Sequence, residues 1–376
     1  MDYIIRNKSL LTEKRNLESL YVFKDFPVFM GCTEEPVSRD IKADMSFAIC
    51  PETGMIQLDK LLPLELVYLA QHNDGVGKIW QEHYGAFAEF IRRFSPQKIL
   101  EIGGSHDAIF NAFFEKNKDV EWTMVEPNPL FKDHDRIKVI REWFDENFTS
   151  RELFDAVVHS HVLEHTYDPP AFLSHIGKFL KPGQKHIFTF PNLIEFLKKK
   201  YTNGLNFEHT CFLTEPFVDY LLEKNGFHIL TKEYFYDHSI FYATEKTMAG
   251  MPDLQLPNHY KEYKSLFVDF IEYHKNLVET LNEKIKKHEG NLYLFGAHIF
   301  SQYLITFGLD TSRIRIVLDN SDLKNKKRLY GTDLLVEKPE FIRDQKNPGV
   351  IVKIANYRDE VVSQLKKINP EVVIFE

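Results

Sequence analysis

The chain contains little cysteine and no long hydrophobic run, and both absences exclude classes of protein. Its three cysteines, Cys32, Cys50 and Cys211, are widely spaced among 376 residues, so no disulfide framework is expected. No stretch approaches the ~20 apolar residues of a membrane-spanning helix. Residues 1–16 are interrupted by charge every few positions, unlike a signal peptide. We therefore expect a cytoplasmic protein that does not enter a membrane.

The chain also lacks an excess of basic residues. It has 47 Lys and Arg against 55 Asp and Glu, a formal net charge of −8. A partner built on a phosphate backbone would require a basic face, and the basic runs at 198–200 and 324–328 are short. Nucleic acid is therefore not an expected partner.

The order of the predicted elements indicates three parts. Residues 1–70 contain short strands separated by polar, proline or glycine breaks. From about residue 78 helices and strands alternate, which favours a parallel, doubly wound sheet. A long amphipathic helix at 257–288 follows, with apolar residues at helical spacing, and the α/β alternation then restarts.

The predicted fold class is therefore α/β: a Rossmann-like central domain, a small β-rich N-terminal domain and a second Rossmann-like domain. The expected boundaries are 1–70 for the N-terminal domain, 71–250 for the central domain, 251–289 for the linking helix and 290–376 for the C-terminal domain.

The segment KILEIGG at residues 98–104 predicts a nucleoside-binding turn. A buried strand leads into Gly103 and Gly104, which can adopt the positive φ of a tight turn and let a ligand lie close to the backbone. Ser105 belongs to the same turn. Glu126 follows the next strand, ~20 residues further on, where a carboxylate can accept hydrogen bonds from both ribose hydroxyls.

A glycine turn with a distant acid also describes NAD-binding domains. Here the full G-x-G-x-x-G spacing is missing, because Ser105, His106 and Asp107 occupy the place of a third glycine. NAD uses that spacing to bring its pyrophosphate onto a helix N-terminus. S-adenosylmethionine has no pyrophosphate, so the departure favours S-adenosylmethionine as the cofactor.

A second signature, FDAVVHSHVLEHTYDP at 154–169, is followed by a helix ending in LKPG and a strand ending in PN. This ordered set resembles class I S-adenosylmethionine-dependent methyltransferases. The resemblance implies that Glu101 faces the amino-acid end of the cofactor and that the segment from His161 and Val162 to Glu164 lies beside the sulfonium. It also implies that the segment containing Trp143 and Phe144 covers the adenine. In an alternative interpretation, Glu164 and His165 only cap the following helix.

The three-part layout resembles a narrower family, the three-domain sugar C-methyltransferases. The likeness is carried by FPVFMG…FAICPETGMIQL, NFEHTCFLTEPFVDYLLEKNGFHI and LFGAHIFSQYLITFGLDTSRIRIVLDNS. It implies a small-molecule substrate, a sugar linked to a nucleotide, in polysaccharide biosynthesis or glycosylation. In this family an N-terminal zinc site uses two C-x-x-C pairs. Here one pair is reduced to Cys50 and the other is absent from RNKSLL, so we predict no metal.

The catalytic segment of that family has the order tyrosine, histidine, glutamate, histidine. Here these places are occupied by Asn206, Phe207, Glu208 and His209. His209 is the expected general base, and Asn206 is an expected donor to an enolate oxygen. His209 with Glu208 suits methylation of oxygen equally well, so carbon and oxygen acceptors both stay open. His238 is a further catalytic candidate, where the family's substrate-pocket strand begins.

Two other functions stay open at this point: an NAD-dependent oxidoreductase and a non-catalytic nucleotide-binding protein. The sequence names neither the sugar nor the oligomeric state. The role of the C-terminal domain is also open, because Gly296 there suits either a substrate phosphate or a plain turn.

Overall fold

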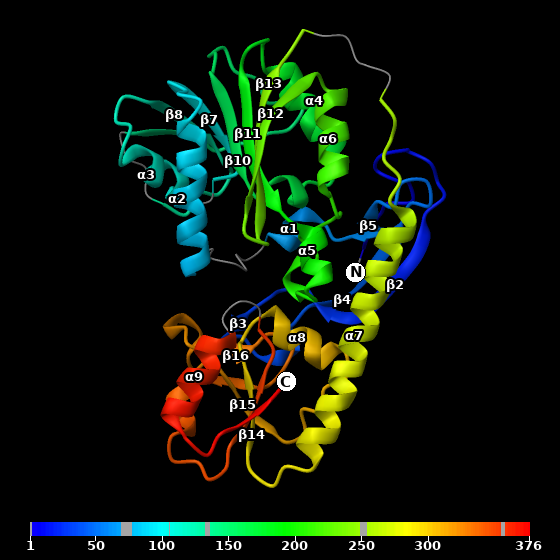
Figure 1. Ribbon diagram of the computed structural model, residues 1–376, viewed down its shortest axis with the longest axis vertical. Helices are drawn as coiled ribbons and strands as arrows, with labels where there is room; N and C mark the ends of the chain where they lie inside the picture. The colour runs from blue at the N-terminus through cyan, green and yellow to red at the C-terminus, as the bar shows by residue number, and fades with distance from the viewer. Residues whose placement is uncertain (1, 69–76, 105, 132–135, 249–253, 355–357) are drawn as a thin grey trace.

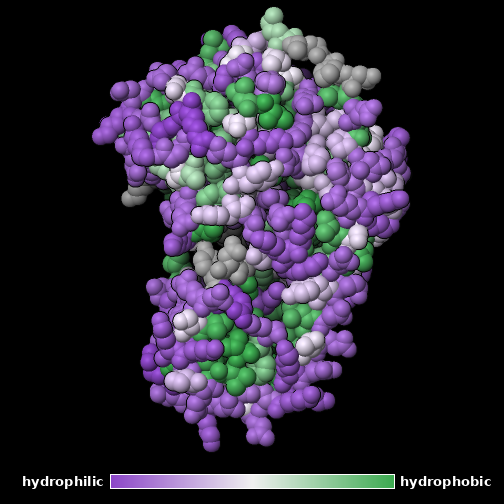
Figure 2. All heavy atoms as spheres, viewed as in Figure 1, coloured by the Kyte–Doolittle hydropathy of each residue, from purple (hydrophilic) through white to green (hydrophobic). Residues whose placement is uncertain are grey.

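The computed structural model describes residues 2–68, 77–104, 106–131, 136–248, 254–354 and 358–376. Two α/β bodies lie one above the other, and a long helix runs along one side of the lower body (Figure 1). The predicted fold class, with two Rossmann-like sheets and a β-rich N-terminal segment, is confirmed. Within the described ranges, no helix has the length and apolar character needed to cross a membrane. The face in Figure 2 is mainly hydrophilic.

The upper body is built on a seven-stranded sheet with the order β12-β13-β11-β10-β7-β8-β9. The five adjacent strands β11, β10, β7, β8 and β9 are parallel to one another, whereas β13 is antiparallel to both of its neighbours, β11 and β12. The strands are β7 (Lys98–Ile102), β8 (Glu121–Val125), β9 (Ile137–Ile140), β10 (Ala156–Ser160), β11 (Lys185–Pro191), β12 (Phe227–Phe235) and β13 (Ser239–Lys246).

Alternating apolar residues cover both faces of this sheet. On one face, Ile99 and Val158 pack with α2 (Lys78–Arg92) and α3 (Ala108–Phe114). On the other face, Leu100 and Val157 belong to the cluster that includes α4 (Pro169–Phe179) and α6 (Glu215–Lys224). Because the parallel strands all end at one edge, the turns that follow β7, β8 and β10 meet there.

The lower body repeats this plan with the strand order β19-β18-β14-β15-β17-β16-β3. The long helix α7 (Tyr260–Lys286) lies close to the predicted range of 257–288. Its C-terminal half contributes Val278, Leu281 and Ile285 to the core of the lower body, whereas the buried residues of its first half belong to the cluster shared by the N-terminal sheet and the upper body. The remaining elements are β14 (Leu292–Phe295), α8 (Ile299–Thr306), β15 (Ile314–Leu318), β16 (Arg328–Leu329), β17 (Leu335–Glu337), β18 (Gly349–Val352), α9 (Arg358–Ile368) and β19 (Val373–Phe375).

The N-terminal segment forms a sheet of β2 (Glu18–Pro27), β4 (Lys42–Ile49) and β5 (Ile56–Leu58), beside a pair of β1 (Ile4–Ile5) and β6 (Lys60–Leu61). This segment also completes the lower body. Its β3 (Cys32–Thr33) pairs with β16, and Asp40 forms an ion pair with Arg328 at 2.6 Å, in which the two side chains are 2% and 9% exposed. The N-terminal segment is therefore bonded to the C-terminal sheet.

Candidate active site

The glycine turn lies at the carboxyl end of β7, as predicted. Gly103 has a φ of +72°, which disfavours any residue with a side chain. A Cβ at Gly103 would lie 2.6 Å from Cγ2 of Val162, and a Cβ at Gly104 would lie 2.5 Å from Cε of Met124. Gly103 therefore lets the turn after β7 come close to the segment after β10, and Gly104 lets it pack against Met124 on β8. Ser105 lies outside the described residues.

Glu101 is buried beneath this turn and is 1% exposed. Its Oε2 accepts a hydrogen bond of 2.8 Å from Nε1 of Trp122, and a Cβ on Gly104 would lie 2.9 Å from its Oε1. Burial raises the pKa of Glu101 to about 8. The carboxyl group therefore takes up a proton near neutral pH, and a cationic ligand would favour its ionised form.

Glu126 follows β8 and lies at the same edge of the sheet. Its Oε1 accepts a hydrogen bond of 2.9 Å from the backbone N–H of Asn128, and burial raises its pKa. The two aromatic residues of the segment predicted to cover the adenine have different surroundings. Trp143 is 54% exposed, with its ring against Tyr68, whereas Phe144 is buried among the rings of Phe148, Phe172, His175 and Phe179.

The structure therefore corrects the role predicted for Phe144. Its ring packs against α4 as part of the core, so Trp143 is the residue of this pair that presents an open aromatic face.

A second group of side chains gathers around the loop after β10. Glu164 and His165, in the short 3-10 helix Leu163–His165, lie with His209 so that one potential ligand atom of each falls within 4.8 Å of the others. Nδ1 of His165 is 3.7 Å from Oε2 of Glu208. Oε2 of Glu164 is buried and has no hydrogen-bond partner within the part of the chain that the structure describes. The loop after β10 and residues 206–210 thus form one polar cluster.

The tautomer of His209 follows from its backbone contact. Its Nδ1 is 3.0 Å from the carbonyl oxygen of Gly204, and a carbonyl only accepts, so Nδ1 carries the proton. The other ring nitrogen, Nε2, is then the basic one. Burial lowers the pKa of His209, so the ring is neutral at pH 7. His209 therefore meets two requirements for a general base.

Burial shifts the pKa values of the neighbouring acid and histidine so that the neutral form of each is favoured. It raises the pKa of Glu208 to about 7 and lowers that of His165 to about 4. Perturbed pairs of this kind are typical of sites that move protons.

The structure corrects the role predicted for Asn206. Its Oδ1 accepts hydrogen bonds from the backbone N–H groups of Glu208 and His209, at 2.9 and 2.8 Å. Its Nδ2 donates to the carbonyl oxygen of Asn203 at 3.2 Å. Asparagine commonly forms such turns with the backbone that follows it. Asn206 therefore shapes the loop that carries His209, rather than pointing a donor at a substrate.

A phenol that the sequence analysis did not select, Tyr68, lies near the same acids. Partial burial and the carboxylate of Glu208 raise its pKa, and Glu164 and Glu126 act in the same direction. Tyr68 is therefore a protonated donor at neutral pH.

His238 and His161 do not lie in the group around His209 but in a second one. They meet His83 on α2, and Trp80 contacts all three imidazole rings. Nδ1 of His161 is 3.0 Å from Oε1 of Glu164, which joins the two groups. Sequence reasoning missed His83 and Trp80, because nothing local shows that this end of α2 reaches the sheet edge.

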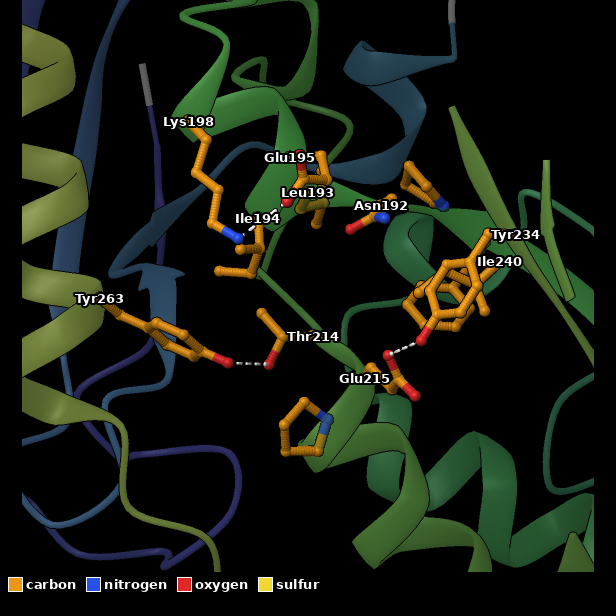
Figure 3. A pocket seen from close by; sticks show the side chains of 13 residues that line it. Asn192, Leu193, Ile194, Glu195, Lys198, Thr214, Glu215, Tyr234, Ile240 and Tyr263 are labelled. Carbon is orange, nitrogen blue, oxygen red and sulfur yellow. Dashed lines mark hydrogen bonds and ion pairs between the residues drawn. The ribbon is translucent and has the colours of Figure 1, made fainter. Parts of the chain in front are cut away.

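A pocket of about 250 Å³ lies nearby, but it contains none of the predicted site residues. Its wall comes from the end of β11, from β12 and β13, and from α5 (Leu193–Lys198), α6 and α7. It includes the hydrogen-bonded pairs Tyr263–Thr214 and Tyr234–Glu215 (Figure 3). It is smaller than the ~300 Å³ of ordinary ligand pockets. The predicted site residues gather instead at the glycine turn and the two polar groups, which we take as the candidate active site.

Neither Cys32 nor Cys50 belongs to a potential metal-ligand group among the described residues. Cys32 lies on β3 in the lower body, where its thiol is 3.7 Å from the carbonyl oxygen of Ala297, whereas Cys50 is buried beside the N-terminal sheet. The absence of an N-terminal zinc site stays a prediction.

Two family models match separate parts of the chain. Residues 79–232 match the model described as a methyltransferase domain, and residues 246–375 match the model described as a C-methyltransferase C-terminal domain. No curated protein matches the sequence.

The similar solved structures are distant. An O-methyltransferase family protein from Burkholderia thailandensis is 11% identical, with 45% of this chain and 57% of that chain covered and a TM-score of 0.37. The N,N-8-amino-8-demethyl-D-riboflavin dimethyltransferase from Streptomyces davawensis is 17% identical, with 45% of this chain and 55% of that chain covered and a TM-score of 0.38. The 1,6-didemethyltoxoflavin N1-methyltransferase from Burkholderia thailandensis is 15% identical, covering 54% and 96%, with a TM-score of 0.39. The chain thus spans little more than half the length of the first two.

Proposed function

Since the chain is a class I methyltransferase, we propose that it transfers a methyl group from S-adenosylmethionine to a carbon atom of a nucleotide-linked keto sugar, with His209 as the general base. The observation that carries the proposal is the hydrogen bond from Nδ1 of His209 to Gly204, which leaves Nε2 unprotonated in a buried polar cluster. The match of residues 246–375 to a C-methyltransferase domain favours carbon over oxygen as the acceptor.

The residues at the sheet edge fit the cofactor. Gly103 and Gly104 keep the turn after β7 tight, because a Cβ at either position would clash with Val162 or Met124. Glu126 offers a carboxylate to ribose hydroxyls, and Glu101 offers one to an ammonium group. Trp143 presents an exposed ring, and it directly follows Glu142, whose backbone N–H donates to the same carbonyl oxygen, that of Ile140, as the N–H of Glu126. When bound, S-adenosylmethionine supplies an electrophilic methyl group on its sulfonium.

The polar cluster fits the proton chemistry of carbon methylation. Nε2 of His209 would take the proton from the carbon next to the ketone, and Tyr68 would donate to the enolate oxygen in the role predicted for Asn206. The partnerless Oε2 of Glu164 is an acceptor suited to a sugar hydroxyl. The likeness of residues 206–229 and 294–321 to sugar C-methyltransferases supports this substrate class.

The test is incubation of the full chain with methyl-labelled S-adenosylmethionine and a panel of nucleotide-linked keto sugars, each beside its reduced alcohol. We expect a product one methylene heavier from a keto sugar only, with the label on carbon by NMR. In D₂O without cofactor, the enzyme should exchange the proton next to the ketone. A label on oxygen would correct the acceptor, and S-adenosylhomocysteine binding without turnover on any panel member would contradict the proposal.

The burial of Glu101 predicts a pH-dependent cofactor site. Its pKa of about 8 means that it is mostly protonated at pH 7 in the free protein. Binding the ammonium group of S-adenosylhomocysteine should lower that pKa and release a proton. Affinity should therefore rise with pH, by up to about tenfold per unit below the pKa, and level off above it.

Isothermal titration calorimetry in buffers of different ionisation enthalpy would measure this proton release directly. Glu101→Gln, which cannot ionise, should bind more weakly at pH 8.5 and lose the pH dependence. Equal slopes for the wild type and Glu101→Gln would show that another group titrates.

A further inference from the structure

Three histidines from separate elements meet beside the active site: His83 on α2, His161 directly after β10 and His238 in the turn between β12 and β13. One potential ligand atom of each lies within 4.8 Å of the others. We propose that these three imidazoles bind a first-row divalent cation, with Zn²⁺ as the favoured ion because it combines readily with imidazole nitrogen. This inference departs from the sequence-based expectation that the chain binds no metal, and it does not rest on the proposed substrate or base.

The first supporting observation is an unsatisfied nitrogen on His83. The residue is fully buried, and its Nε2 is 3.3 Å from Oγ1 of Thr189. Its Nδ1 is buried and has no hydrogen-bond partner within the described part of the chain. A buried polar atom left in this state destabilises the folded protein. A bound cation would satisfy it.

The second observation is the carboxylate behind His161. Oε1 of Glu164, a residue 1% exposed, is 3.0 Å from Nδ1 of His161. Metal-binding histidines usually donate their other N–H to such a carboxylate, which fixes the tautomer. Nε2 of His161 then points its lone pair at Ser239, whose Oγ is 2.9 Å away and also lies 2.5 Å from Nδ1 of His238. Ser239 is therefore placed between two of the proposed ligands.

The surroundings keep these rings in place. His161 has a φ of +53°, a left-handed conformation that is uncommon for residues other than glycine and recurs at functional sites. The Trp80 indole lies edge-on to His161 and His238, with ring centroids 4.8 and 4.7 Å apart.

The geometry requires only a small contraction. Zn–N bonds of about 2.0–2.1 Å in a tetrahedral site place ligand atoms roughly 3.4 Å apart. Side chains at up to 4.8 Å therefore need to approach by about one ångström or a little more. Three histidines fill three positions and leave the fourth to the Ser239 hydroxyl, water or an oxygen of the substrate.

A second group could compete for the same ion, namely Glu164, His165 and His209. The experiment must separate the two groups. His238 is suited to this purpose because it belongs to the first group alone and is only partly buried. His165, also partly buried, belongs to the second group alone and is the matched control.

The test uses the full chain, stripped with a chelator and titrated with Zn²⁺, or with Co²⁺ whose visible absorption reports the ligand set. We expect one ion per chain, at least tenfold weaker binding in His238→Ala and no change in His165→Ala or Cys32→Ser/Cys50→Ser. Retained folding is checked by circular dichroism. No stoichiometric binding, binding unaffected by His238→Ala, or loss of the ion in His165→Ala would each overturn the proposal.

Discussion

Replacing His209 with asparagine is expected to lower kcat by about 10²–10⁴-fold while S-adenosylhomocysteine still binds as in the wild type. In His209→Asn the new side-chain amide would reproduce the donor that Nδ1 offers to the carbonyl of Gly204, so the loop keeps its hydrogen bond. What is lost is the basic Nε2. The measurement is steady-state turnover on the active keto sugar, beside calorimetric binding of S-adenosylhomocysteine.

The matched control is His228→Asn, since His228 is an exposed histidine on β12. That variant should retain wild-type turnover. Proton exchange in D₂O without cofactor adds a second readout, because His209→Asn should abolish it together with methylation. Exchange that persists in His209→Asn would assign the base to another residue of the cluster, and His165 would then be the next to test.

The fold was predictable where the signal is local. The segment at 98–102 combines buried apolar residues with a following glycine pair, and both the strand and the turn form there. The stripe at 257–288 gives a helix over Tyr260–Lys286. The pairing of β3 with β16 was not predictable, because it joins Cys32 to Leu329 across most of the chain and involves two residues on each strand.

The same distinction applies to the site. Glu101, Gly103 and Glu126 occupy the sheet edge because strand ends are fixed by the fold. The role predicted for Asn206 failed because an asparagine in a loop satisfies the nearest backbone N–H groups first. His83 was missed because its place beside His161 depends on how α2 packs against the sheet.

The sequence analysis did not select Arg6, the first residue of RNKSLL, where the resembled family would have zinc ligands. Arg6 donates from Nη2 to the carbonyl oxygen of Tyr167 at 2.6 Å and from Nη1 to that of Thr210 at 2.8 Å. Tyr167 follows Glu164 and His165, and Thr210 follows His209. One guanidinium is thus hydrogen-bonded to both loops of the polar cluster. The carbonyl oxygen of Thr210 also accepts a hydrogen bond from the backbone N–H of Leu58, at the end of β5.

Arg6→Met is therefore expected to destabilise the protein and to slow it further than the loss of stability explains. Two partly buried carbonyls lose charged donors, which should cost about 3 kcal/mol of unfolding free energy. Misplacement of the two loops should lower kcat by about 10–100-fold, with S-adenosylhomocysteine affinity little changed because the glycine turn is not contacted.

The measurements are thermal unfolding and kcat taken well below the melting temperature. Arg6→Lys should recover part of both losses, because an ammonium can reach one carbonyl but lacks the planar fork that serves two. Arg15→Met is the control, since Arg15 is an exposed arginine of the same segment. If Arg6→Met and Arg15→Met behave alike, Arg6 does not position the loops. If kcat falls with Tm unchanged, the N-terminal segment acts on the active site through this guanidinium rather than through overall stability.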